Sequence, residues 1–376
     1  MKALTGHSVL PYLRDWDLLD ETGLAQSQYT VADNPHGSTR NTHLIVTRAQ
    51  ETGFFVKQAR LIPLGEEIDE LTDTLQLEGV FYQRARELPD LAAHLPRPYP
   101  IPRNNSDPYI ATDHVLLTEY IPDSTPLMEY LRQLPHFVTT SPPPRLALAR
   151  RLGEVLALFH QRLEANGGPM RTNEWPVFRP PLLDIDERHL NVLKQSDNRL
   201  LSFLGNRLEQ SNSLASLHQL RELWTPSQLI HTDARLANFL VQQKPGTEPP
   251  EITLYLTDWE YAAQGDPVFD VASLIASYLR LSLGMSGFFS QQEIHESIFQ
   301  LGRGYLLTHP ADPLKSKWLL LVIQHAGVQL IQQFYSLASR VPDEPFRNEA
   351  EVSLELLTLG IEYLNRPIDI LAKIIP

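Results

Sequence analysis

A chain of 376 residues can hold two domains. Its 45 acidic and 32 basic residues give a net charge of −13. This charge argues against sequence-independent nucleic-acid binding, because such binding requires a basic face. The absence of cysteine excludes disulfides, thiolate metal sites and cysteine nucleophiles. The N-terminus lacks the apolar core of a secretory signal and no apolar run reaches the ~20 residues that span a bilayer, so we expect a cytoplasmic protein with no membrane partner.

The first third of the chain is rich in predicted strands. A short helix within residues 8–30 precedes strands over 28–32 and 43–48. Between these strands lies a turn-forming segment, Asp33–Asn41, whose small residues either form a plain hairpin turn or offer backbone N–H groups to phosphate. A further strand over 53–57 follows.

That strand ends in Lys57, a lysine placed directly after a continuous apolar run. It is either an edge lysine that reaches water or a cation that reaches nucleotide phosphates. The helix predicted over 75–86 carries Glu78 beside its apolar face. Glu78 either pairs with Lys57 and holds its ammonium in place, or is an ordinary solvated acid.

Prolines make residues 95–102 extended, since they remove backbone donors and disfavour helix in the residue before them. Strands are predicted over 109–112 and 114–120, and the second of these stops at Pro122. Residues 123–126 form a connector. We therefore place a boundary between two lobes here, with residues 1–121 as an N-terminal nucleotide-binding lobe and 122–376 as a C-terminal catalytic and substrate-binding lobe.

Helices dominate the remainder of the chain. A helix-period stripe over 145–165 ends near His160, which we interpret as a capping or core histidine. Residues 170–227 form a long, weakly patterned insertion with helices predicted over 198–208 and 214–223. Further helices are predicted over 271–283, 291–307, 313–339 and 348–363. A strand-rich first third followed by a helix-rich remainder indicates an α+β, two-lobed architecture.

The most informative stretch is Leu229–Asp270, in which three polar residues stand in an apolar setting: Asp233, Asn238 and Asp258. They lie beside two short apolar runs, over 228–230 and 252–256, that read as strands. The segment 244–250 reads as the turn of a hairpin before the second run. Loops on a rigid strand scaffold commonly expose functional groups, so we interpret this stretch as a phosphoryl-transfer centre.

Phosphoryl transfer requires an oriented acceptor hydroxyl, Mg²⁺ to neutralise charge and a cation on the phosphates. Carboxylate and amide oxygens such as those of Asp258 and Asn238 suit Mg²⁺. The Asp233 carboxylate can accept the proton of a hydroxyl, and Lys57 can meet the phosphates. Taken singly, such Asp and Asn residues in loops are more often caps and turn formers.

The joint pattern carries more weight. The motif His231-x-Asp233-x-x-x-x-Asn238, then Asp258-Trp-Glu260, then Gly265-Asp-Pro-x-Phe-Asp270, resembles the aminoglycoside phosphotransferase and choline kinase group of protein-kinase-like enzymes. The resemblance implies a protein-kinase-like fold, with a small β-rich N-terminal lobe, a larger helical C-terminal lobe and an ATP cleft between them. It also implies ATP and Mg²⁺ as cofactors. Thr232 stands where the group usually has glycine, and the segment His36–Asn41 has a single glycine.

Roles follow from the resemblance residue by residue. Asp233 is implied as the catalytic base, with Asn238 and Asp258 as Mg²⁺ ligands. The implied ATP-binding set is Lys57, Glu78, Ser38 and backbone groups of Glu119 and Ile121. The implied structural supports are His231, Asp266 and Asp270, with Asp270 tying the catalytic loop to the helix that follows.

Three functions are compatible with these residues. The first is an ATP-dependent kinase of a hydroxyl on a small molecule. The acidic net charge of the chain is compatible with an acceptor that carries an amine. The second is a kinase of Ser/Thr hydroxyls on a peptide, acting with a partner lyase in a peptide-modification pathway. The third is a catalytically silent nucleotide-binding or scaffold protein.

Overall fold

The computed structural model describes residues 4–19, 29–33, 41–48, 53–59, 68–100, 114–134, 143–163, 175–244, 246, 251–284, 289–309, 315–340 and 347–375. The strand predicted over 109–112 and most of the segment 33–41, including Ser38, lie outside these residues. The chain divides into two compact units, the first comprising residues 1–127 and 238–262 and the second comprising 128–237 and 263–376.

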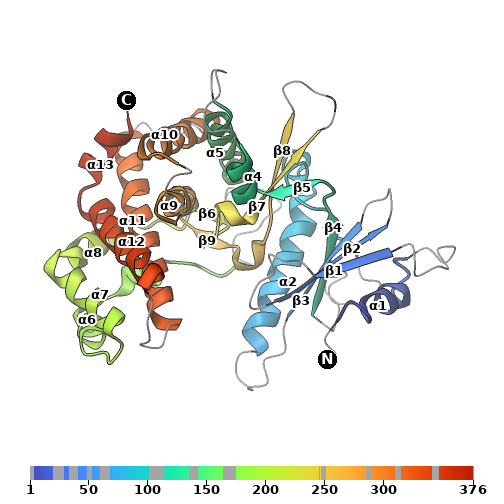
Figure 1. Ribbon diagram of the computed structural model, residues 1–376, viewed down its shortest axis with the longest axis horizontal. Coiled ribbons are helices and arrows are strands. Elements are labelled where there is room, and N and C mark those ends of the chain that lie inside the picture. The colour runs from blue at the N-terminus through green and yellow to red at the C-terminus, as the bar shows by residue number, and fades with distance from the viewer. Residues whose placement is uncertain are drawn as a thin grey trace. The chain divides into compact units, whose positions relative to one another are not determined.

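The first unit is built on an antiparallel sheet whose strands follow chain order (Figure 1). Its strands are β1 (Tyr29–Asp33), β2 (Asn41–Arg48), β3 (Gly53–Ala59) and β4 (Val115–Tyr120). Helix α1 (Val9–Asp15) packs on this sheet, and Val9 and Leu13 share a buried cluster with Leu44 and Val56. Apolar residues of strands and helix thus form one core, to which β2 contributes the buried residues Leu44 and Val46.

Residues 238–262 belong to this first unit rather than to the helical one, which differs from the predicted division into residues 1–121 and 122–376. A second sheet has the order β5 (Ser124–Pro126), β7 (Phe239–Gln243) and β8 (Ile252–Leu256), and the turn Trp259–Tyr261 that follows β8 packs on the N-terminal residues through Phe81. The predicted connector 123–126 therefore contains a strand. Helices α2 (Ile68–Ala85) and α3 (Pro89–Ala92) complete the unit.

The second unit is mostly helical, with a short ladder of β6 (Gln228–Ile230) and β9 (Ala263–Gly265). Its helices are α4 (Leu127–Gln133, which starts at the unit boundary), α5 (Pro144–Arg162), α6 (Glu187–Lys194), α7 (Arg199–Gln210), α8 (Ser213–Leu223), α9 (Val268–Gly284), α10 (Gln291–Thr308), α11 (Lys315–Arg340), α12 (Arg347–Asn365) and α13 (Pro367–Ile374). Helix α9 lies among α10, α11 and α12 (Figure 1).

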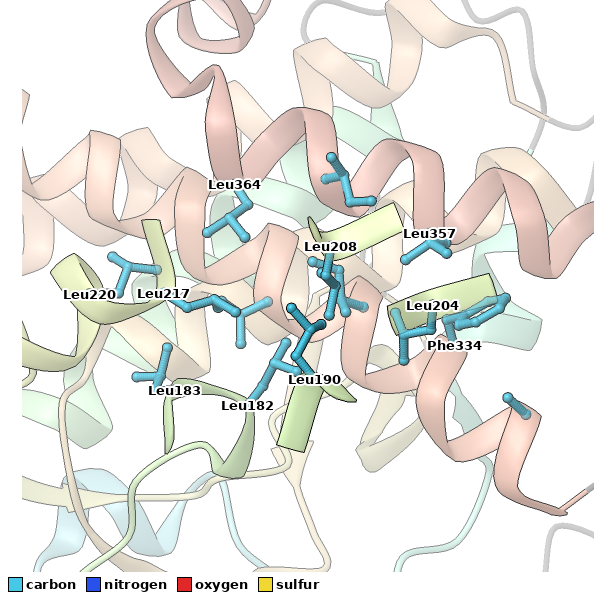
Figure 2. Packing of buried hydrophobic residues seen from close by; sticks show 14 residues of the cluster. Leu182, Leu183, Leu190, Leu204, Leu208, Leu217, Leu220, Phe334, Leu357 and Leu364 are labelled. Carbon is cyan, nitrogen blue, oxygen red and sulfur yellow. The ribbon is translucent and has the colours of Figure 1, made fainter. Parts of the chain in front are cut away.

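Helices α6, α7 and α8 arise from the insertion predicted over 170–227, and α3, α4, α6 and α13 have no counterpart in the sequence prediction. The insertion has its own apolar core, which continues into α11 and α12 (Figure 2). Buried members of this cluster include Leu190, Leu204, Leu217, Phe334, Leu357 and Leu364. The insertion is therefore an integral part of the second unit rather than a loose loop.

Two glycines bring α5 and α10 into close contact. A Cβ at Gly153 would lie 2.0 Å from the carbonyl oxygen of Leu301, and one at Gly304 would lie 2.1 Å from that of Arg150. Only glycine permits this approach of the two backbones. Among the described residues, no helix is long and apolar enough to cross a membrane.

Candidate functional site

In the first unit, strand β3 and helix α2 bring Lys57 and Glu78 together. The Lys57 Nζ atom lies 2.7 Å from Glu78 Oε2. It also lies 2.5 Å from Asp258 Oδ1 and 2.8 Å from Glu260 Oε2. One ammonium is thus held by three carboxylates, two from the segment after β8 and one from α2.

Burial decides how these groups ionise. The side chains of Lys57 and Glu78 are each 4% exposed, so little water screens their charges. Burial lowers the pKa of Lys57, but the three surrounding carboxylates outweigh it and hold that pKa well above its usual value. Burial also raises the pKa of Glu78 to about 7, against the opposing effect of the Lys57 ammonium. The lysine therefore stays charged.

The segment Asp258–Glu260 is fixed onto helix α2 by aromatic packing. The Trp259 ring stacks on Phe81 with centroids 3.7 Å apart and an interplanar angle of 10°, and its Nε1 donates to the Leu256 carbonyl at 3.0 Å. The Asp258 N–H donates to the Tyr82 hydroxyl at 3.2 Å. Asp258 itself has φ 69°, a left-handed conformation that aspartate tolerates better than most residues.

Asn238 directly precedes β7 and contacts Thr257, the residue before Asp258. Its backbone carbonyl accepts a bond from the Thr257 N–H at 2.9 Å and one from the Thr257 hydroxyl at 3.0 Å. Asn238 and Asp258 are therefore carried by the adjoining ends of two paired strands.

The donor set suits a divalent cation. Glu78, Asp258 and Glu260 each present an oxygen within 4.8 Å of the others. Even with the Lys57 ammonium among them, the carboxylates leave the cluster with a net negative charge, which favours a cation. Asp258 is the most accessible of the three, with 32% of its side chain exposed against 4% and 6%. The oxygen ligands and the charge thus fit Mg²⁺.

In the second unit, the loop after β6 is held by Asp270 of α9. The fully buried Asp270 carboxylate accepts bonds from the N–H of His231 at 2.7 Å and of Thr232 at 2.9 Å. Its Oδ2 also lies 3.0 Å from His160 Nε2, and the His160 Nδ1 lies 2.8 Å from the Tyr305 hydroxyl. Asp270 thus ties the loop to α9, and His160 is a core residue.

The loop after β6 also contains an ion-pair partner for Asp233, the nearby residue Arg235. Asp233 N–H donates to His231 Nδ1 at 3.2 Å, and the Asp233 carboxylate forms an ion pair with Arg235 at 2.5 Å. A quarter of the Asp233 side chain is exposed. Thr232, where the resembling enzymes usually have glycine, has φ 65°. A β-branched residue is strained in that left-handed conformation, and the two bonds at Asp270 keep the loop in place.

The predicted adenine-binding groups belong to the end of β4. The Glu119 N–H donates to the Arg97 carbonyl at 2.6 Å, and the Ile121 carbonyl accepts a bond from the Ser124 hydroxyl at 2.8 Å. Two of the four backbone groups at these positions are therefore already bonded within the protein.

Sequence reasoning assigned no role to Asn41, Tyr82, Arg235 or Glu260. Glu260 belongs to the motif Asp258-Trp-Glu260 that carries the family resemblance, and this is the one sequence feature from which a role for Glu260 could have been predicted. No sequence pattern indicated a role for Asn41. Its Nδ2 donates to Glu260 Oε2 at 2.9 Å, and the two residues are 219 positions apart in the sequence.

A separate apolar cavity of about 320 Å³ lies among helices α9, α10, α11 and α13 of the second unit. Its lining includes Ile298, Trp318 and Ile374, with Arg303 as the charged member. None of the sequence-predicted site residues lines it. The cavity is therefore separate from the cluster around Lys57.

Comparisons with known proteins identify the family and the fold. The family described as "Phosphotransferase enzyme family" matches residues 40–287, more than half of the chain. A search of curated proteins found no match.

Solved structures share the fold. Choline kinase from Cryptosporidium parvum Iowa II is 14% identical with a TM-score of 0.60, covering 99% of this chain and 98% of that one. An ethanolamine kinase of Plasmodium vivax is 13% identical with a TM-score of 0.54, covering 94% and 86%. An amicoumacin kinase in complex with AMP-PNP, Ca²⁺ and Ami is 14% identical with a TM-score of 0.55, covering 95% and 93%. The predicted α+β, protein-kinase-like fold is confirmed.

Proposed function

The chain belongs to the phosphotransferase enzyme family, and from that premise we propose that it transfers the γ-phosphoryl group of ATP, with Mg²⁺, to a hydroxyl of a small molecule. The observation that supports this proposal most directly is the buried Lys57 ammonium, held by Glu78 and Asp258 in the first unit. A buried lysine fixed by carboxylates is a rigid cation for phosphate oxygens, and the accessible Asp258 is a ligand for the metal.

In the proposed reaction, the acceptor hydroxyl gives its proton to the Asp233 carboxylate while its oxygen forms a bond to the γ-phosphorus of ATP. The bond from that phosphorus to the bridging oxygen breaks, and ADP leaves with the electron pair. Asp233 acts as base and orients the hydroxyl, and Asp270 keeps the loop of Asp233 in position.

The remaining roles concern the nucleotide. Lys57 would contact the α- and β-phosphates, and Asn238 and Asp258 would hold Mg²⁺, which supplies neutralising positive charge at the phosphates when bound. Because the Glu119 N–H and the Ile121 carbonyl have partners in the protein, we assign adenine to the Glu119 carbonyl and the Ile121 N–H. Ser38 remains a proposed phosphate contact outside the described residues.

An amine-bearing acceptor is the substrate class that we propose. The net charge of −13 favours cationic small molecules over anionic ones. The fold relatives named as choline and ethanolamine kinases, each with a TM-score above 0.5, support the same class. The proposal includes the expected cytoplasmic location.

The test is phosphoryl transfer by the purified protein. A panel of amino alcohols, aminated sugars and Ser/Thr peptides is incubated with ATP and Mg²⁺, and mass spectrometry records the gain of one phosphate. We expect transfer to a small molecule that is abolished by Asp233→Asn and by EDTA, and is unchanged in the exposed control Asp197→Asn. Transfer to peptides alone would replace the small-molecule assignment, and nucleotide binding without any transfer would indicate a scaffold.

A further inference from the structure

Glu260 shares one carboxylate oxygen between two partners in the first unit. Its Oε2 lies 2.8 Å from the Lys57 ammonium and accepts a bond from Asn41 Nδ2 at 2.9 Å. Asn41 is the first residue of β2, and Glu260 lies in the short helical turn Trp259–Tyr261. Two segments far apart in sequence thus meet at the atom that holds the lysine.

The contact is built into the core. Asn41 is 2% exposed and the Glu260 side chain is 6% exposed. The second polar atom of Asn41, its Oδ1, is buried with no hydrogen-bond partner among the described residues. The Nδ2 bond to Glu260 is therefore the contact through which the Asn41 side chain acts on the cluster.

The three carboxylates around Lys57 differ in access. Glu78 and Glu260 are almost fully buried, whereas a third of the Asp258 side chain is exposed. Only Asp258 can therefore exchange its bond to the ammonium for a bond to an incoming cation without exposing the core. The two glutamates keep their hold on Lys57.

We propose that Glu260, oriented by Asn41, is a positioning residue of the cation and nucleotide site, because it holds Lys57 together with Glu78 and so leaves Asp258 available to the divalent cation. This inference rests on the proposed function. Without Glu260, Lys57 depends on Asp258 and competes with the cation for it, and the cluster also loses one negative charge. The affinity for the cation should therefore fall more than the affinity for the nucleotide.

The test measures binding rather than turnover. Mn²⁺ binding in the presence of AMP-PNP is followed by electron paramagnetic resonance, and AMP-PNP binding without metal is followed by calorimetry. For Glu260→Gln we expect cation affinity to fall about tenfold or more, the range for partners that orient metal ligands. The nucleotide affinity without metal should change by less than about threefold. Glu260→Asp, which retains the charge, should recover part of the loss.

Asn41 provides the second arm. Asn41→Leu should weaken Mn²⁺ binding in the same direction but less than Glu260→Gln does. If Asn41 acts through Glu260, the double variant binds Mn²⁺ no more weakly than Glu260→Gln alone. Additive losses would show that Asn41 acts separately and would overturn its assigned role.

The matched control is Glu251→Gln, which removes the same charge from an exposed ion pair with Lys244 in the same unit and should leave Mn²⁺ binding unchanged. Thermal unfolding verifies that each variant is folded. A folded Glu260→Gln that binds Mn²⁺ like the wild type overturns the inference. Failure of the wild type to bind Mn²⁺ with AMP-PNP would instead overturn the proposed function.

Discussion

The Arg235 guanidinium is ion-paired with the carboxylate of Asp233, with Nη2 and Oδ2 2.5 Å apart. The residue assigned as base is thus fixed by a cation two positions along the same loop. The pair is partly open to water, with 46% of the Arg235 side chain exposed. Such pairs contribute little to stability, so the consequence of this one lies in the orientation of Asp233.

We expect Arg235→Ala to lower kcat about tenfold, a part of the 10²–10⁴-fold that a positioned general base contributes. The free energy of unfolding should change by less than about 1 kcal/mol, because the pair is exposed. Steady-state kinetics and urea unfolding measure the two quantities. Arg235→Lys, which keeps the charge, should lose less activity.

Arg179→Ala is the matched control, since it removes an arginine from an exposed ion pair with Asp184 in the same unit. Its kcat should equal that of the wild type. An Arg235→Ala enzyme with unchanged kcat would show that the pair does not orient the base.

The buried Asp270 carboxylate accepts bonds from three donors, the N–H groups of His231 and Thr232 and the Nε2 of His160, and removing it takes this acceptor from all three. Asp270→Ala should lower the free energy of unfolding by about 3–5 kcal/mol, because buried donors lose their acceptor and His160 loses its charged partner. Urea unfolding measures the change, and Asp270→Asn should be intermediate. On the same helix, Ser277→Ala removes a hydroxyl bonded to the Ser273 carbonyl and should cost about 0.5 kcal/mol. Equal losses in the two alanine variants would contradict the bracing role.

Helix α10 contains a matched pair of glycines that differ in their surroundings. A Cβ at Gly304 would meet the Arg150 carbonyl at 2.1 Å, whereas one at Gly302 would meet nothing within 4 Å. Gly304→Ala should therefore lower the free energy of unfolding by about 1–3 kcal/mol by forcing α5 and α10 apart. Gly302→Ala should raise it by about 0.5–1 kcal/mol through helix propensity. Thermal unfolding of both variants tests the prediction, and shifts of the same sign would refute it.

His325 is buried on α11, and burial lowers its pKa from 6.5 to about 3. Its ring lies 5.4 Å from that of Trp224, and its Nδ1 has no partner among the described residues. Above pH 6.5 the imidazole is neutral in both the folded and unfolded states. As the pH falls from 6.5 towards 3, only the unfolded chain takes up the proton, so stability is lost across that window.

When the pH is lowered from 7.5 to 5, the uptake of a proton by His325 in the unfolded chain should reduce the free energy of unfolding by about 2 kcal/mol. The reduction is about 1.36 kcal/mol for each pH unit below 6.5. In His325→Leu that part of the pH dependence should disappear from urea unfolding curves. His218→Gln, at an exposed position of the same unit, should retain it. A variant at His325 with the full wild-type dependence would assign the acid sensitivity to other groups.

Local patterns determined much of the fold. The apolar runs at 228–230 and 252–256 are the strands β6 and β8, and the stripe of α11 has Ile323, Leu330 and Phe334 buried. Such elements follow from side-chain periodicity, which is written in consecutive residues. Helices α3, α4, α6 and α13 were missed because each has eight residues or fewer, too few to show a clear period.

The sequence by itself also indicated the family: the spacing of Asp233, Asn238 and Asp258, and the placement of Lys57 after an apolar strand, carried the resemblance that the family match confirms. Only the tertiary structure decided that residues 238–262 join the N-terminal strands and that three carboxylates surround Lys57. It alone placed Asn41 on Glu260, 219 residues away. The physical reason is that these contacts depend on strand pairing and burial between distant segments, which no local period or spacing encodes.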